Sequence, residues 1–220
     1  MVTLSEENYL KTIYHLGKQG KDAVSTNAIA EQMETKASSV TDMIKKLADK
    51  DLVNYIKYQG VSLTNPGRLT ATSVIRKHRL WELFLVEKLN FSWDEVHDIA
   101  EQLEHIKSEK LINQLDAYLN FPTHDPHGDP IPDKDGNYAP IMGKSILEIK
   151  KVANGVLTCV KDSSDVFLKY LNKNQLALGD HIKIIDFEPF DESFVIETKS
   201  KQMSISKHVA ENLYLNIIDD

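Results

Sequence analysis

In the first 64 residues, the spacing of apolar side chains indicates helices and strands in an order that few small folds have. Apolar residues recur at helical spacing over residues 3–17, 25–33 and 38–50, and strand-like runs follow over residues 52–56 and 61–64. Thr3 and Glu6 form a capping box for the first helix. The order helix, helix, turn, helix, hairpin predicts a winged helix-turn-helix domain over residues 1–65.

A helical domain is predicted over residues 66–143. Asn65, as the cap, and Pro66, at the first position, begin a long helix that reaches about residue 89. A second capping box at Ser92-Trp93-Asp94-Glu95 begins a helix to about residue 105, and Ser108 caps another to about residue 119. We expect the long helix from Pro66 to Leu89 to contribute to a dimer interface; the alternative, which does not exclude the first, is a plain core helix within the chain.

The composition changes twice in the second half of the chain. Residues 120–143 hold five of the seven prolines and three of the nine glycines, which predicts a loop or linker at a domain boundary. From Lys144 onward short alternating runs predict strands and a small β-barrel over residues 144–220. The predicted strands are 146–149, 156–160, 181–186, 194–197 and 202–205. The fold class is therefore predicted as mainly α with a small β-barrel.

Charge is distributed unevenly along the chain. The net charge is −7, but residues 1–80 hold 12 basic and 8 acidic side chains, while the remainder is strongly acidic. A basic N-terminal third indicates a polyanionic partner at that end. Cys159 is the one cysteine, so no disulfide framework is expected, and no signal peptide or membrane-spanning run is recognisable. We expect a cytoplasmic protein with no membrane association.

The predicted third helix is the candidate DNA-reading element, because recognition helices place their N-terminal residues at base edges. Small hydroxyl side chains there allow close approach, and basic side chains one turn later can contact phosphates. A plain three-helix bundle with a solvated basic face is the alternative. The candidate DNA-binding residues are Lys36, Ser38, Ser39, Thr41, Lys45 and Lys46, with Lys57 at the hairpin tip.

Histidine and glutamate recur at helical spacing on two consecutive predicted helices. His97, Glu101, Glu104 and His105 fall on one helix face at 100° per residue, and His78 lies four residues before Glu82. A cation would turn the repulsion between the carboxylates into binding. Such a set suits Mn(II), Fe(II) or Zn(II). The alternative interpretation is that these are solvated helix residues. The loop adds Asp125-Pro126-His127, a motif that by itself is more often a polar loop than a pair of ligands.

Taken together, these segments resemble the metal-dependent repressors of the diphtheria toxin repressor type, including manganese-sensing members of three domains. The resemblance implies a winged helix domain, a helical metal-binding and dimerisation domain, and an SH3-like barrel related to FeoA. It rests on Glu7-Asn8-Tyr9-Leu10-Lys11-Thr12-Ile13-Tyr14, Arg76-Lys77-His78-Arg79-Leu80-Trp81-Glu82, Val96-His97-Asp98-Ile99-Ala100-Glu101-Gln102-Leu103-Glu104-His105 and Asp125-Pro126-His127-Gly128-Asp129-Pro130-Ile131-Pro132.

Two metal sites follow from the resemblance. The first would use Asn8, His78, Glu101, Glu104 and His105; the second would use Glu82, Asp125, His127 and Asp162, with His97 as a further candidate. Ligands without sulfur favour Mn(II), with Fe(II) as the alternative. Asn8 departs from the usual aspartate or methionine, Asp125 stands where close relatives can have cysteine, and Lys11 stands where some relatives have an acidic ligand.

The resemblance implies a repressor of metal-uptake genes that binds operator DNA as a homodimer when its metal sites are filled. It implies no enzymatic activity. Two alternatives use the same His/Glu residues, a metalloenzyme and a metal-storage protein. The sequence shows neither a nucleophile motif nor a glycine-rich phosphate loop, and storage leaves the basic N-terminal third unexplained.

Overall fold

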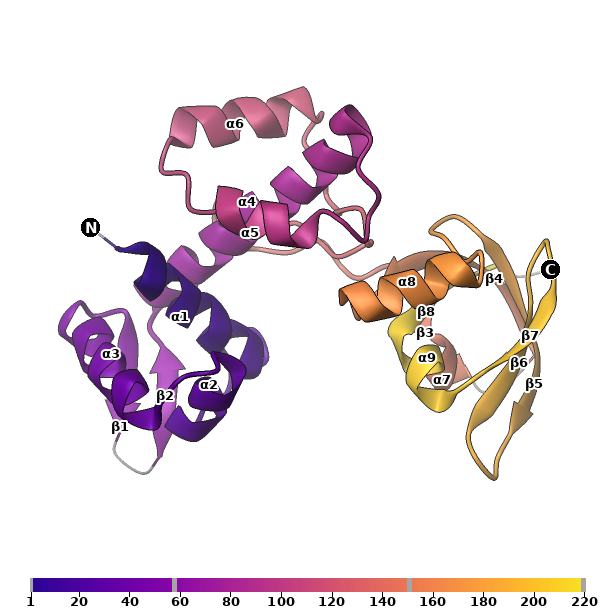
Figure 1. The fold of residues 1–220 in the computed structure, drawn as a ribbon, viewed down its shortest axis with the longest axis horizontal. Helices are drawn as coiled ribbons and strands as arrows, with labels where there is room; N and C mark the ends of the chain where they lie inside the picture. Colours follow the sequence, from indigo (N-terminus) through magenta and orange to yellow (C-terminus); the bar gives the residue numbers. More distant parts are fainter. Residues whose placement is uncertain (1, 57–58, 150–151, 219–220) are drawn as a thin grey trace. The chain divides into compact units, whose positions relative to one another are not determined.

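The computed structural model describes residues 2–56, 59–149 and 152–218. It forms two compact units, which we describe separately. The first contains residues 1–81, 100–114 and 132–138, and the second contains residues 82–99, 115–131 and 139–220. Figure 1 shows the elements of both units in chain order.

The first unit begins with the predicted arrangement of three helices and a hairpin (Figure 1). Strands β1 and β2 pair antiparallel from Val53 opposite Leu63, and an isolated bridge joins Val24 to Val61. The predicted order is thus confirmed, with boundaries within about two residues. The elements are α1 (Leu4–Leu16), α2 (Thr26–Gln32), α3 (Ala37–Asp49), β1 (Val53–Ile56), β2 (Gly60–Leu63) and the start of α4 (Asn65–Leu89).

The core of this unit consists of the apolar faces that the helical spacing predicts. Leu10 and Ile13 of α1 are fully buried, as are Ile29 of α2 and Ile44 of α3. Burial of an aliphatic side chain of this size contributes about 1.5–3 kcal/mol to folding. The core therefore fixes how α1 and α3 present their remaining faces.

Two predicted helix starts differ from the structure. Thr64, not Asn65, caps α4, because its hydroxyl accepts a hydrogen bond from the Gly67 N–H at 3.2 Å. Only half of the second capping box forms: the Glu95 carboxylate accepts the Ser92 N–H at 3.0 Å, but the Ser92 hydroxyl donates to the same carboxylate at 2.8 Å and the Glu95 N–H donates to the Ser92 carbonyl at 3.0 Å, which closes a turn. The next helix, α5 (His97–Leu103), starts later and ends before Glu104. Helix α6 (Glu109–Tyr118) follows, with Ser108 at its start as predicted.

The C-terminal part of the second unit is a six-stranded antiparallel sheet with helices on one side (Figure 1). The strand order is β3-β8-β4-β5-β6-β7. Its strands are β3 (Lys144–Ser145), β4 (Ala153–Val160), β5 (His181–Glu188), β6 (Ser193–Glu197), β7 (Gln202–Ile205) and β8 (Leu213–Ile218), and its helices are α7 (Ile146–Ile149), α8 (Asp165–Lys173) and α9 (Lys207–Asn212).

This sheet corrects the predicted mainly α fold with a closed barrel. The chain is helices plus a sheet, and within 144–149 and 152–218 the strand pairs run from β3 to β7 without closing. The predicted strand at 146–149 is the short helix α7 instead. Phe167 and Leu171 of α8 belong to the same buried core as Phe194 and Ile196 of β6, so helix and sheet share one core.

No helix in the described part of the chain has the length and apolar character needed to cross a membrane.

Glu6 links the start of α1 to the end of α3. Its carboxylate accepts the Thr3 N–H at 2.9 Å and lies 2.7 Å from the Lys50 ammonium. Burial raises the pKa of Glu6, but the hydrogen bonds from Lys50 and Thr3 lower it more, so this pKa lies below its ordinary value.

Replacing Glu6 with glutamine should therefore lower the free energy of unfolding by about 1–2 kcal/mol at neutral pH. A carboxylate with a lowered pKa stabilises the fold above its unfolded pKa and loses this contribution as the pH falls through its folded pKa. The difference between the two proteins should shrink in acid, as urea unfolding at neutral and acid pH would measure. Glu31→Gln, on an exposed position of α2, serves as the control and should change stability by less than about 0.5 kcal/mol. An equal loss at both pH values would contradict this role of the charge.

Candidate metal centres

Glu104 is the central acidic side chain of the first predicted site. It follows the last residue of α5, and its side chain is only 1% exposed. The His78 Nδ1 donates to its Oε2 at 2.6 Å, and the Lys11 ammonium lies 2.8 Å from the same oxygen and 3.0 Å from Oε1. Glu104 therefore joins α1, α4 and the segment after α5 within the first unit.

The charge of Glu104 is maintained by these neighbours. Burial raises the pKa of Glu104, but the hydrogen bond from His78 and the ammonium of Lys11 lower it by more, so this pKa lies below its ordinary value. The carboxylate therefore stays ionised at neutral pH although it is buried. A buried anion that depends on neighbouring cations is a suitable metal ligand.

His105 connects the same cluster to the first turn of α1. Its Nδ1 lies 2.6 Å from Glu7 Oε2, and its Nε2 lies 3.6 Å from Glu104 Oε1. Glu7 was not among the predicted ligands, because a glutamate in the first turn of a helix is usually a favourable partner of the helix dipole. The sequence contained one signal that Glu7 faces the same way as Lys11: the two residues are four apart, and residues at this spacing share a helix face.

Asn8 contributes a buried oxygen that lacks a partner. Among the described residues, no group donates a hydrogen bond to its Oδ1. A buried amide oxygen without a partner costs about 1–3 kcal/mol, which a bound cation would remove. The donor set of carboxylate, imidazole and amide groups thus fits a divalent metal ion. Glu101 is more peripheral, half-exposed and 3.7 Å from the Lys11 ammonium.

Of the four residues predicted to share one helix face, His97 and Glu101 lie on α5, and Glu104 and His105 follow its last residue. Helix α5 ends at Leu103, so Glu104 and His105 lie beyond the regular helix. These two belong to the first unit, whereas His97 belongs to the second. The Glu104 N–H still donates to the Ala100 carbonyl at 2.8 Å, so the helix ends about two residues before the predicted end at His105.

The second predicted site has a buried nucleus of three residues in the second unit. Ligand atoms of Glu82, Asp125 and His127 lie within 4.8 Å of one another, and all three side chains are buried. His97 is half-exposed, with its Nδ1 3.4 Å from Glu82 Oε1. Asp162 lies just after β4 and is not part of this group; its Oδ1 accepts the Ser164 N–H at 2.9 Å.

The loop around His127 sets the orientation of its ring. Its Nε2 lies 2.9 Å from the Trp93 carbonyl oxygen and must donate to it, which leaves Nδ1 without a proton in the neutral ring. That Nδ1 is 3.9 Å from both Glu82 Oε2 and Asp125 Oδ1. A metal-binding histidine has this arrangement, with one nitrogen fixed by a hydrogen bond and the other facing the acidic groups.

Trp93 and Gly128 support this loop and were not among the predicted site residues. The Trp93 ring stacks on His127 with centroids 6.0 Å apart, and its Nε1 donates to Asn172 of α8 at 2.8 Å. Gly128 has a φ of +84°, and a Cβ atom there would lie 2.2 Å from the Thr158 carbonyl oxygen. The glycine thus allows the loop to lie directly on β4.

The predicted DNA-reading residues occupy the outer side of α3. Val40, Ile44 and Leu47 are buried, and Thr41 is half-buried with its hydroxyl donating to the Ala37 carbonyl at 2.9 Å. Lys57 lies outside the described residues. The exposed members of the set are Lys36, Ser38, Ser39, Lys45 and Lys46.

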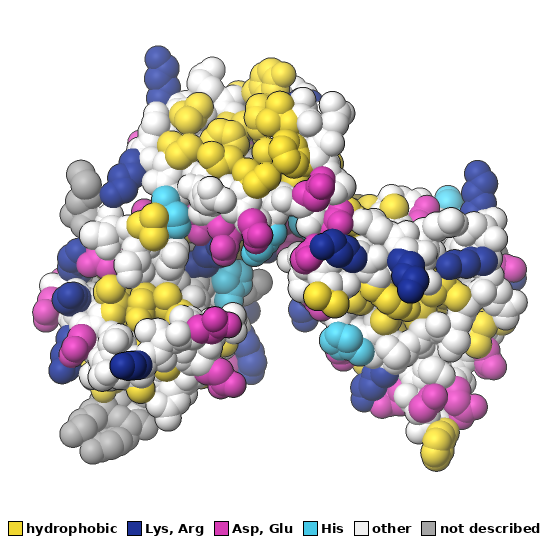
Figure 2. All heavy atoms as spheres, in the orientation of Figure 1, with side chains coloured by type: hydrophobic (Ala, Val, Ile, Leu, Met, Phe, Trp, Pro, Cys, Tyr) yellow, Lys and Arg dark blue, Asp and Glu magenta, His cyan; other side chains and the backbone are white. Residues whose placement is uncertain are grey.

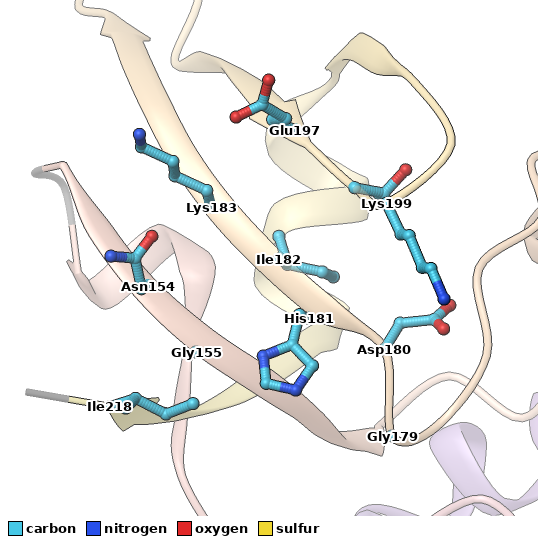
Figure 3. Close-up of a pocket in the computed structure, with 11 residues that line it drawn as sticks. Asn154, Gly155, Gly179, Asp180, His181, Ile182, Lys183, Glu197, Lys199 and Ile218 are labelled. Carbon is cyan, nitrogen blue, oxygen red and sulfur yellow. The ribbon is translucent and has the colours of Figure 1, made fainter. Parts of the chain in front are cut away.

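A groove of about 820 Å³ lies at one end of the sheet (Figure 3). Its lining includes His181, Lys183, Glu197 and Lys199, a mixture of both charges. No predicted metal-binding or DNA-binding residue lies among those that line it.

Three family models match successive parts of the chain. The iron dependent repressor N-terminal DNA binding domain matches residues 1–61, and the iron dependent repressor metal binding and dimerisation domain matches residues 64–133. The FeoA domain matches residues 144–216.

Individual relatives agree with these models. The iron-dependent repressor IdeR of Mycobacterium leprae is 37% identical over 126 residues, which are 57% of this chain and 54% of that protein, so the chain spans about half the length of this relative. A solved structure of a manganese-dependent transcriptional repressor in complex with manganese is 32% identical, with a TM-score of 0.86 and coverage of 97% of this chain and 100% of that one. ScaR with bound Zn²⁺ is 31% identical, with a TM-score of 0.80 over 97% and 99% of the two chains.

The diphtheria toxin repressor of Corynebacterium diphtheriae is 33% identical over 191 residues, which cover 82% of this chain and 84% of that protein. The chain belongs to the diphtheria toxin repressor family of metal-dependent transcriptional regulators.

Proposed function

We propose that this protein is a metal-dependent transcriptional repressor in the cytoplasm. It binds operator DNA as a homodimer when Mn(II), or alternatively Fe(II), fills its metal sites, and it controls metal-uptake genes. The main supporting observation is that ionic contacts join α1, which belongs to the DNA-reading unit, to Glu104 and His105.

The first site would be formed by Asn8, His78, Glu101, Glu104 and His105, and the second by Glu82, Asp125 and His127, with His97 and Asp162 as further candidates. Oxygen and nitrogen ligands without sulfur favour Mn(II) over softer ions, with Fe(II) next. The relatives include proteins described as iron-dependent and as manganese-dependent, which is compatible with both ions.

Bound metal would supply positive charge between side chains that come from separate elements. Asn8 and Glu7 would hold α1 in place, while Glu104 and His105 would hold the segment after α5. We call the arrangement in which α1 contacts the segment after α5 the docked form. A metal ion that binds only to the docked form stabilises it by about 2.7 kcal/mol when the metal concentration is 100 times its Kd. Operator affinity rises by the same coupling energy if docking sets the position of α3.

The DNA contacts would come from Lys36, Ser38, Ser39, Thr41, Lys45 and Lys46, together with Lys57. The dimer would use an apolar surface of the helical region that matches the dimerisation domain. Tyr118 at the end of α6 is 62% exposed, Phe121 is 68% exposed and Leu89 of α4 is 50% exposed. Figure 2 shows hydrophobic side chains gathered over α6 and the end of α4. The proposed domains are 1–65, 66–143 and 144–220.

Fluorescence anisotropy against promoter DNA of metal-uptake genes tests this proposal. We expect tight binding with Mn(II) or anaerobic Fe(II) and weak binding without metal, at fixed salt because phosphate contacts are salt-dependent. In Glu104→Gln the metal-induced gain should fall by about tenfold or more, because loss of a ligand or its close partner commonly costs that much in metal affinity. Glu109→Gln, on an exposed position of α6, is the matched control.

Equal binding with and without metal would contradict metal activation. Metal binding without any DNA binding would instead favour metal storage.

The second site generates a separate prediction that uses its neighbouring tryptophan. In a Trp81→Phe protein, Trp93 is the remaining tryptophan and stacks on His127. Mn(II) should quench its fluorescence, and His127→Gln should abolish the quenching because it removes the Nδ1 that faces Glu82 and Asp125. His181→Gln, exposed at the start of β5, should leave the quenching unchanged. Quenching that survives in His127→Gln would place the ion elsewhere.

A further inference from the structure

The Lys11 ammonium lies directly on the carboxylate of Glu104. Its Nζ is 3.0 Å from Oε1 and 2.8 Å from Oε2, and 3.7 Å from Glu101 Oε1. The Lys11 side chain is 16% exposed, and the Glu104 side chain is 1% exposed. Both oxygens of the most buried acidic group in this site are therefore already in contact with a fixed cation.

A metal ion that binds through Glu104 needs these same oxygens. An ammonium and a divalent ion repel each other, and the repulsion is strong where little water screens it. Oε2 also accepts the hydrogen bond from His78, so the carboxylate has little remaining capacity. Metal coordination by Glu104 therefore requires the ammonium to move away.

Lys11 also makes a connection of the kind proposed for the metal. It belongs to α1, and Glu104 follows α5, so the pair joins these two parts of the first unit. The bond between His105 and Glu7 joins the same parts a second time. An internal cation thus holds α1 against the metal-binding segment before any ion binds.

We propose that Lys11 is an internal competitor of the metal ion for Glu104, an inference that rests on the function proposed above. Because metal replaces an existing ionic contact, it gains only the difference between two attractions. Lys11 thereby lowers the metal affinity and sets the concentration at which the protein responds. Lys11 also maintains part of the docked arrangement in the metal-free protein. It thereby reduces the difference in docking between the metal-free and the metal-bound protein.

Calorimetric titration with Mn(II) tests the competition. The experiment uses the full chain with Asp125→Asn, which removes a carboxylate of the second cluster and keeps the Oδ1 that accepts the His127 and Asp129 N–H groups. Adding Lys11→Met should tighten Mn(II) binding by about tenfold, because a hydrogen-bonded charge pair no longer has to be broken. Lys11→Gln provides a second variant of similar length and should change the affinity in the same direction.

Removing any nearby positive charge also weakens the electrostatic repulsion of the metal ion and so tightens its binding. A substitution of Lys77 separates this general effect from the direct contact that Lys11 makes. Lys77 is buried, and burial lowers its pKa while the charges of Glu7 and Glu104 raise it. No described hydrogen bond joins Lys77 to Glu104. Lys77→Met should therefore leave the Mn(II) affinity within about twofold of the parent. Equal tightening by Lys77→Met and Lys11→Met would overturn the proposal.

A second readout requires no metal. In metal-free protein, urea unfolding of Lys11→Met, Glu104→Gln and the double variant should show non-additive losses of stability, because the two side chains are in contact. Additive losses would show that the pair is not formed and would overturn the competition.

The outcomes also distinguish this inference from the proposed function. If the parent binds no Mn(II), Fe(II) or Zn(II) at the first site, both the function and the competition are wrong. If the parent binds metal but Lys11→Met binds it equally or more weakly, only the competition is wrong.

Discussion

The ionised carboxylate of Glu104 is the constraint on which the first unit depends. A buried anion is costly unless cations and hydrogen-bond donors surround it. His78, Lys11 and His105 provide them, and they come from α4, from α1 and from the residue after Glu104. The need to balance one charge therefore brings three elements together. In the function proposed above, an added divalent ion would meet the same need.

The second unit also buries acidic side chains, but a different structure surrounds them. Glu82, Asp125 and His127 are buried together, and the loop that supplies two of them is held by backbone contacts to β4. The Val160 N–H donates to the His127 carbonyl at 2.8 Å, and the side chain of Trp93 links the same region to α8. The C-terminal sheet thus positions a candidate ligand loop in addition to forming its own core.

The helical half of the chain could be predicted well from its sequence because its apolar spacing and caps are local signals. The sheet was predicted less accurately: residues 146–149 read as a strand by alternation, but tertiary packing makes them a helix. The predicted helix end at about His105 lies two residues beyond Leu103, where α5 ends, because sequence signals fix helix ends only to within a few residues. Glu7, Trp93 and Gly128 were missed because their roles arise from contacts between distant segments. The assignments of individual metal ligands and domain boundaries remain predictions.

The proposed function requires α1 and the segment after α5 to share one metal ion. A crystal structure of the Mn(II)-loaded protein, with the ion located by its anomalous scattering, would show whether they do. We expect an ion bound by Glu104 and by the Asn8 Oδ1, with the Lys11 ammonium displaced from Glu104. An ion bound away from these two residues, with the contact between Lys11 and Glu104 intact, would contradict it.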